Sequence, residues 1–141
     1  MKNNKGFSLV ELIVVIAIMA ILAAVAIPTF ATFITKANQA ADDQFLADAE
    51  YAVQLANTAD PSAVISPVTV TYVEAAEGVA AHLEITYGTG EDAITVKESD
   101  LTDDEATTVQ KEIASILDWS FTFKYYNNTA TITNGVITGN H

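Results

Sequence analysis

The chain has 141 residues, half of them hydrophobic, and its formal net charge is −12 at pH 7. It contains no cysteine, which excludes disulfides, thiol chemistry and cysteine-ligated zinc. The acidic charge argues against direct binding to nucleic acid, because the phosphate backbone would be repelled. The length suits one domain with a modest core.

The first element is an apolar segment, Phe7–Ile27, which only Ser8 and Glu11 interrupt. About 21 residues at about 1.5 Å per residue give a helix of about 32 Å, long enough to cross a bilayer. A carboxylate costs about 2.5–3.5 kcal/mol at a bilayer centre unless it finds a partner, so Glu11 predicts a functional contact. Lys2 and Lys5 precede the segment and favour a cytoplasmic N-terminus, with the remainder of the chain outside.

A short basic leader, the order Gly6-Phe7-Ser-Leu-Val-Glu11 and an apolar run that ends at Pro28 resemble the N-terminus of a type IV pilin precursor. The resemblance implies that a prepilin peptidase cuts between Gly6 and Phe7 and that the new Phe7 amine is methylated. It also implies that Glu11 pairs with the Phe7 amine of a neighbouring copy. Phe7, Glu11 and Pro28 are therefore the expected assembly residues. An ordinary membrane anchor with an incidental Glu11 is the alternative interpretation.

The resemblance further implies the partners and the location of the chain. The partners are other copies in a helical homopolymer, the prepilin peptidase, a platform protein and ATPase-driven assembly machinery. The chain would lie in the cytoplasmic membrane before assembly and in an extracellular pilus afterwards. We expect no enzymatic activity and no cofactor, since no Ser-His-Asp arrangement and no glycine-rich phosphate loop can be recognised.

Pro28 predicts a bend, because proline removes one backbone hydrogen bond and clashes with the preceding turn. Beyond it, apolar residues recur at three- and four-residue steps from Phe30 to Ala56, which predicts an amphipathic helix that ends near Asn57. The helix from Phe7 to Asn57 would be about 76 Å long. Acidic residues are expected between the apolar positions: Asp42, Asp43, Asp48 and Glu50. Aromatic side chains are expected to pack against the sheet and neighbouring helices: Phe30, Phe33, Phe45 and Tyr51.

The remainder predicts an α+β head, in which an antiparallel sheet of about four to six strands lies over the second half of the long helix. Alternating apolar and polar residues predict strands at 68–73, 82–87, 93–97, 119–126, 129–133 and 136–138. Asn134-Gly135 predicts a hairpin turn. Thr102 and Glu105 match a capping box, which predicts a second helix over 103–117.

These elements divide the chain into three parts: a leader at 1–6, a transmembrane and filament-core helix at 7–30, and a globular head at 31–141. Loss of Lys2 and Lys5 with the leader would change the side-chain charge from −12 to −14. A chain shortened to begin at Ala31 is expected to be soluble without detergent.

Few residues of the head suggest further chemistry. His82 and His141 are expected to be surface histidines rather than ligands or catalysts. The acidic clusters are interpreted as solvated rather than as calcium sites: Glu91-Asp92, Glu98 with Asp100, and Asp103 to Glu105. Asn127-Asn-Thr129 is a turn in the simpler interpretation and a glycosylation acceptor in the other.

The sequence favours a structural subunit of a type IV pilus. A pseudopilin of a type II secretion or DNA-uptake machine carries the same N-terminus, and so does a minor adhesive pilin. A membrane-anchored enzyme is the fourth possibility, which the missing catalytic constellation disfavours.

Overall fold

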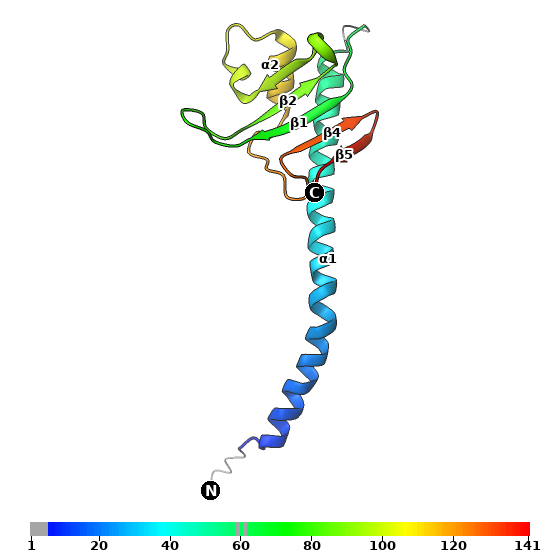
Figure 1. The fold of residues 1–141 in the computed structure, drawn as a ribbon, viewed down its shortest axis with the longest axis vertical. Coiled ribbons are helices and arrows are strands. Elements are labelled where there is room, and N and C mark those ends of the chain that lie inside the picture. Colours follow the sequence, from blue (N-terminus) through cyan, green and yellow to red (C-terminus); the bar gives the residue numbers. More distant parts are fainter. Residues whose placement is uncertain (1–5, 59, 61) are drawn as a thin grey trace. The chain divides into compact units, whose positions relative to one another are not determined.

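A computed structural model describes residues 6–58, 60 and 62–141. Most of the expected leader, residues 1–5, lies outside the described residues, as does Pro61 in the expected loop. The chain divides into two compact units, one that ends at Ala37 and one that comprises Asn38–His141. The architecture is α+β, with a long helix followed by an antiparallel sheet and a short helix (Figure 1).

The long helix, α1, spans Leu9–Ala56 and comprises 48 residues, close to the bounds that the apolar periodicity predicted. It continues through Pro28 without interruption, and the expected bend there stays a prediction. At its C-terminal end, the Asn57 side chain donates to the Val53 carbonyl at 2.8 Å. This bond satisfies one of the carbonyls that a helix end leaves without a partner.

Five antiparallel strands form the sheet: β1 Val68–Val73, β2 His82–Tyr87, β3 Ile94–Lys97, β4 Thr129–Thr133 and β5 Val136–Gly139. Their order across the sheet is β3-β2-β1-β4-β5, which the sequence did not predict. Every adjacent pair is antiparallel, as expected. Figure 1 shows the sheet with its green and red strands side by side.

The β4–β5 connection confirms the predicted hairpin. Asn134 and Gly135 have φ angles of 49° and 78°. Positive φ at both central residues is the requirement of a type I′ turn, which asparagine and glycine meet at low cost.

The core of the second unit lies between the C-terminal part of α1 and one face of the sheet. Alternate residues of β1 are buried, Val68 and Val70, while Thr69 between them is partly exposed. On α1, Leu46, Ala49 and Val53 are fully buried at helical spacing. Phe45 stacks on Phe121 with ring centroids 4.0 Å apart, which confirms the packing expected of Phe45. In the single chain, by contrast, Phe30, Phe33 and Tyr51 are exposed.

The opposite face of the sheet carries a row of threonines in register, one from each strand: Thr95, Thr86, Thr69, Thr131 and Thr138. The hydroxyls of Thr69 and Thr131 are 3.0 Å apart, and those of Thr86 and Thr95 are also 3.0 Å apart. The hydroxyls of these two pairs satisfy each other, and the threonine row is uncharged although the chain is strongly acidic.

The predicted strand at 119–126 is wrong, because this segment is irregular and forms no ladder. Its backbone N–H groups instead bond to a side chain of α1. Lys124, Tyr125 and Tyr126 donate to Asp42 Oδ2 at 3.0, 2.7 and 3.1 Å. The alternating aromatic residues that suggested a strand serve to pack this segment against α1.

Asp42, which the amphipathic pattern placed among the polar positions of the long helix, is fully buried in the structure. A buried carboxylate is tolerated only where hydrogen bonds compensate its lost hydration, and three backbone N–H groups do so here. Next to it, Asp43 accepts the Tyr126 hydroxyl at 2.7 Å. Burial, aided by the Asp43 bond, raises the pKa of Tyr126 to about 12.

The second helix, α2, spans Thr108–Ile116 rather than 103–117. Its cap is Thr107, whose side chain accepts from Gln110 N at 3.2 Å while the Gln110 side chain accepts from Thr107 N at 2.9 Å. The predicted cap, Thr102, instead ends a short 3-10 helix, Glu98–Leu101. The later start still brings Ile113 into the core.

Gln110 also reaches the edge of the sheet. Its Nε2 donates to the Thr95 carbonyl of the edge strand β3 at 3.1 Å. At the other edge, β5 is only four residues long. A Cβ at Gly139 of β5 would overlap the Tyr126 ring, so only glycine allows this close approach.

Candidate processing and assembly site

The predicted cleavage bond joins two residues that lie outside the helix. Gly6 and Phe7 are exposed and have no helical structure, and α1 begins at Leu9. The Phe7 side chain is 90% exposed. The structure thus places the Gly6–Phe7 bond just before the first helical turn.

Ser8 and Glu11 make two reciprocal hydrogen bonds at this helix start. Ser8 Oγ accepts from Val10 N at 3.3 Å, and Glu11 Oε2 accepts from Ser8 N at 2.8 Å. The Ser8 carbonyl accepts the first bond of the helical ladder, from Leu12 N, at 3.3 Å. These contacts form a variant of the capping box in which Ser8 Oγ accepts from the second rather than the third helical N–H, and they satisfy two N–H groups at the helix start.

Sequence reasoning identified Glu11 but missed Ser8. The spacing Ser-x-x-Glu ahead of an apolar run is the usual signature of a capping box, so the signal was present. Glu11 Oε1 makes no hydrogen bond within the described part of the chain. One carboxylate oxygen therefore stays available for a further donor while the other caps the helix.

The helix that follows exposes a long apolar surface. It contains a window long and apolar enough to cross a membrane, and no residue of that window is buried. Exposed apolar patches on this scale mark surfaces that other molecules or a membrane cover. Near its start, a shallow apolar groove surrounds Glu11, lined by Phe7, Ser8, Leu9, Leu12 and Val15.

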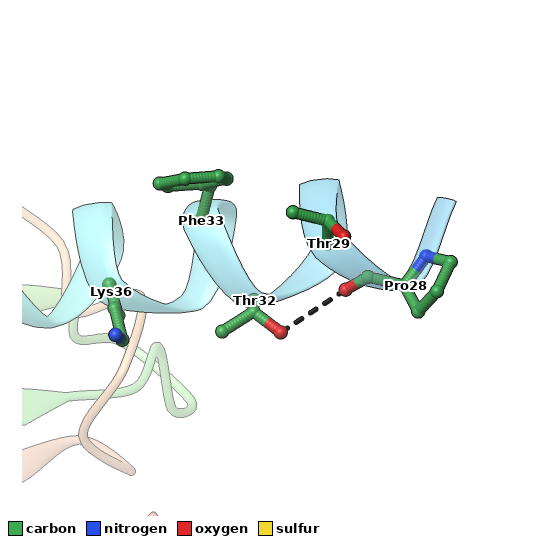
Figure 2. A pocket seen from close by; sticks show the side chains of 5 residues that line it. All are labelled: Pro28, Thr29, Thr32, Phe33 and Lys36. Atoms are coloured by element: carbon green, nitrogen blue, oxygen red, sulfur yellow. Dashed lines mark hydrogen bonds between the residues drawn. The ribbon is translucent and has the colours of Figure 1, made fainter. Parts of the chain in front are cut away.

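A second groove surrounds the predicted assembly residue Pro28. Figure 2 shows the residues that line it: Pro28, Thr29, Thr32, Phe33 and Lys36. The threonine hydroxyls bond to the helix itself, Thr32 to the Pro28 carbonyl at 3.1 Å and Thr29 to the Val25 carbonyl at 2.9 Å. Because these hydroxyls are satisfied, lipid or another helix can cover the two threonines without leaving a donor unpaired, whereas Lys36 brings a charge to the same groove.

The structure does not bring the head's candidate residues into one site. His82 lies on β2 and bonds to Glu84, whereas His141 packs on Tyr125 with ring centroids 4.4 Å apart. Asp100 was expected to be solvated but is buried, and it accepts from Lys97 N at 2.9 Å. Within the described residues, no group of three or more His, Cys, Asp or Glu side chains is placed to hold a metal ion.

Asn127 and Asn128 form a bend, in agreement with the predicted turn. Asn128 has a φ of 60°, and its side chain donates to Glu74 Oε1 at 3.0 Å. Asn127 is exposed, and its N–H donates to the Asn140 carbonyl at 2.6 Å.

We predict that His82 titrates above its ordinary pKa. A hydrogen bond to the Ala80 carbonyl and a second to Glu84 both favour the charged ring and raise its pKa. The charged ring therefore stabilises the head fully below about pH 6.5, and this contribution is lost as the pH rises through the raised pKa. NMR titration of the ring should show this shift, and Glu84→Gln should move the pKa back towards the ordinary value. Glu91→Gln, at an exposed acid elsewhere, serves as the control; equal His82 pKa values in both variants would contradict the assignment.

The comparisons with known proteins concern the N-terminus. Residues 1–27 match the prokaryotic N-terminal methylation motif, which is the class III signal peptide of type IV pilin-like proteins. No curated protein and no solved structure matches the chain significantly. The chain therefore carries the N-terminal motif of type IV pilin-like proteins, followed by an α+β fold of pilin-like architecture.

Proposed function

We propose that this chain is a structural subunit of a type IV pilus, which polymerises through its N-terminal helix into a helical surface filament. One observation carries the proposal: the N-terminal methylation motif, residues 1–27, coincides with an apolar helical surface that the chain's own fold leaves uncovered. A membrane covers that surface before assembly, and other copies cover it afterwards.

Processing comes first in this proposal. A prepilin peptidase removes residues 1–6, and the Phe7 amine is methylated. Residues 7–30 then form the filament core, and residues 31–141 form the head. Because two lysines leave with the leader, the side-chain charge of the mature chain changes from −12 to −14.

Assembly needs a driving force other than the hydrophobic effect, because lipid tails and a helix bundle are both apolar. Close packing of side chains supplies part of it, and small residues at helical spacing favour close approach: Ala17, Ala20 and Ala24. The charge pair between Glu11 and a neighbour's Phe7 amine supplies the rest. Such a pair fixes the axial register more than it adds stability.

The partners follow from this route. They are the peptidase, other copies of the chain, a platform protein and ATPase-driven machinery that extracts subunits from the cytoplasmic membrane. The head faces outward throughout. No enzymatic role and no direct contact with nucleic acid are part of the proposal.

Mass spectrometry and electron microscopy of purified surface fibres test the proposal together. We expect fibres composed mainly of this chain, with a methylated Phe7 at the N-terminus. Retention of residues 1–6 in exported material would refute the processing step. Absence of long fibres would favour a pseudopilin, and a minor share in fibres of another pilin would favour a tip-located adhesive subunit.

A further inference from the structure

The position at which α1 begins determines whether the Gly6 carbonyl, next to the predicted cleavage bond, accepts a helical hydrogen bond. In a helix, the carbonyl of each residue accepts from the N–H four positions later. A helix that continued to Gly6 would therefore bond the Gly6 carbonyl to Val10 N. In the structure, Val10 N donates to Ser8 Oγ at 3.3 Å instead.

The Gly6 carbonyl is the group that the cleavage reaction attacks. Hydrolysis adds the hydroxyl of water to the Gly6 carbonyl carbon, breaks the bond to Phe7 N and leaves a proton on the new amine. A carbonyl held in a helical hydrogen bond is shielded within the first turn, whereas one before the cap is open. Gly6 and Phe7 are both exposed and non-helical.

We propose that Ser8 is a positioning residue for processing: the capping contacts of Ser8 and Glu11 begin the helix at Leu9 and thereby present the Gly6–Phe7 bond to the peptidase in non-helical form. This inference rests on the proposed function, since it assumes cleavage at this bond. Ser8 acts through the backbone of its own chain and need not touch the reacting atoms.

Loss of the Ser8 hydroxyl changes the helix start in a definite direction. Near the membrane, an N–H group without a partner is costly, and extension of the helix by one turn supplies the missing acceptors. Alanine is also the strongest helix former. In Ser8→Ala, Val10 N therefore turns to the Gly6 carbonyl, and the cleavage bond enters the helix.

Glu11 supports the cap with an oxygen rather than with its charge. Its Oε2 accepts from Ser8 N at 2.8 Å, and a glutamine side chain offers the same acceptor. Glu11→Gln therefore retains the capping box but loses the charge that the assembly proposal requires. The two roles of this residue are separable by one substitution.

The test measures cleavage of the full-length chain in detergent micelles by purified prepilin peptidase. We expect Ser8→Ala to raise KM by up to about fivefold with unchanged kcat, because only the non-helical fraction binds and a lost N-cap shifts the helix equilibrium by about that ratio. Ser8→Thr keeps the hydroxyl acceptor and should restore the wild-type KM. Glu91→Gln, which changes an exposed acid of the head, is the control and should be cleaved as the wild type is.

Backbone chemical shifts of Gly6 and Phe7 provide a second readout, and they should become helical in Ser8→Ala alone. An unchanged KM in Ser8→Ala, a raised KM without helical shifts, or a failure of Ser8→Thr to restore KM would each overturn the inference. If the wild-type chain itself is not cut at Gly6–Phe7, the proposed function fails together with it. Normal wild-type cleavage with an unchanged Ser8→Ala leaves the proposed function intact and removes this inference alone.

Discussion

Asp42→Ala should destabilise the head by at least about 3 kcal/mol, the largest effect that we expect from a single substitution there. The carboxylate is fully buried, and it accepts the backbone N–H groups of Lys124, Tyr125 and Tyr126. Alanine would leave three donors without a partner, and each unsatisfied buried donor costs about 1–3 kcal/mol. Denaturant unfolding of the full chain in mild detergent, followed by Trp119 fluorescence, measures the loss.

Asp48→Ala is the matched control, because Asp48 lies on the same helix, is exposed and bonds only to the Gln44 side chain. Its effect should stay within about 0.5 kcal/mol. Amide exchange at Lys124 to Tyr126 should accelerate in Asp42→Ala and not in Asp48→Ala. Equal unfolding midpoints for the two variants would show that Asp42 does not hold this segment.

Glu11→Ala should permit cleavage at Gly6–Phe7 yet reduce filament yield more than tenfold. In the filament core, the Phe7 amine of a neighbouring copy would lose its counter-charge, and an unpaired charge in apolar surroundings costs at least about 2.5 kcal/mol. That free energy corresponds to well over a tenfold change in an association constant. Sedimentation of sheared fibres and immunoblotting for the processed chain measure the two steps separately.

Glu11→Gln separates the charge from the helix cap in the same assay. It should be processed normally and should assemble as poorly as Glu11→Ala, because assembly requires the charge. Fibres of normal length and number from Glu11→Ala would refute the pairing. Normal fibres from Glu11→Gln alone would show that the residue acts through hydrogen bonding instead.

Local pattern predicted the elements that their own alternation or turn residues mark, even where the partner strand is distant in sequence, as it is for β1 and β4. The alternation of β1, β2 and β4 gave their bounds correctly, because one face of each strand is buried and the other is not. Asn134-Gly135 predicted its hairpin, since few residues adopt positive φ twice in succession.

The incorrect predictions have a common physical cause. Hydrogen-bond partners and packing contacts far away in the sequence compete with the local pattern, and a short stretch of sequence does not reveal them. Residues 119–126 alternate like a strand, but their N–H groups bond to a carboxylate 82 to 84 positions earlier. Asp42 itself resembles a solvated acid by its type, although its spacing from Phe45 and Leu46 places it on the buried face. For α2, Thr102 and Thr107 both match a capping box, and only tertiary packing selects Thr107.

The predictions for the N-terminal site rest on the motif, and the structure adds what the motif does not contain. Gly6, Phe7 and Glu11 were recognisable from their order and spacing. Ser8 was not among the predicted residues, because a small polar residue near the start of an apolar run is as consistent with a membrane segment as with a helix cap. Its bond to Val10 N is a local feature that the sequence pattern alone could have indicated.

Dense arrays of identical β-rich heads risk cross-β stacking, in which an open strand edge recruits the edge of the next copy. Both edge strands of this sheet, β3 and β5, disfavour such pairing with another copy. Gln110 occupies the Thr95 carbonyl on β3, and β5 offers only four residues to an incoming strand. In the proposed filament, crowded heads would therefore remain separate folded bodies and avoid amyloid-like fusion.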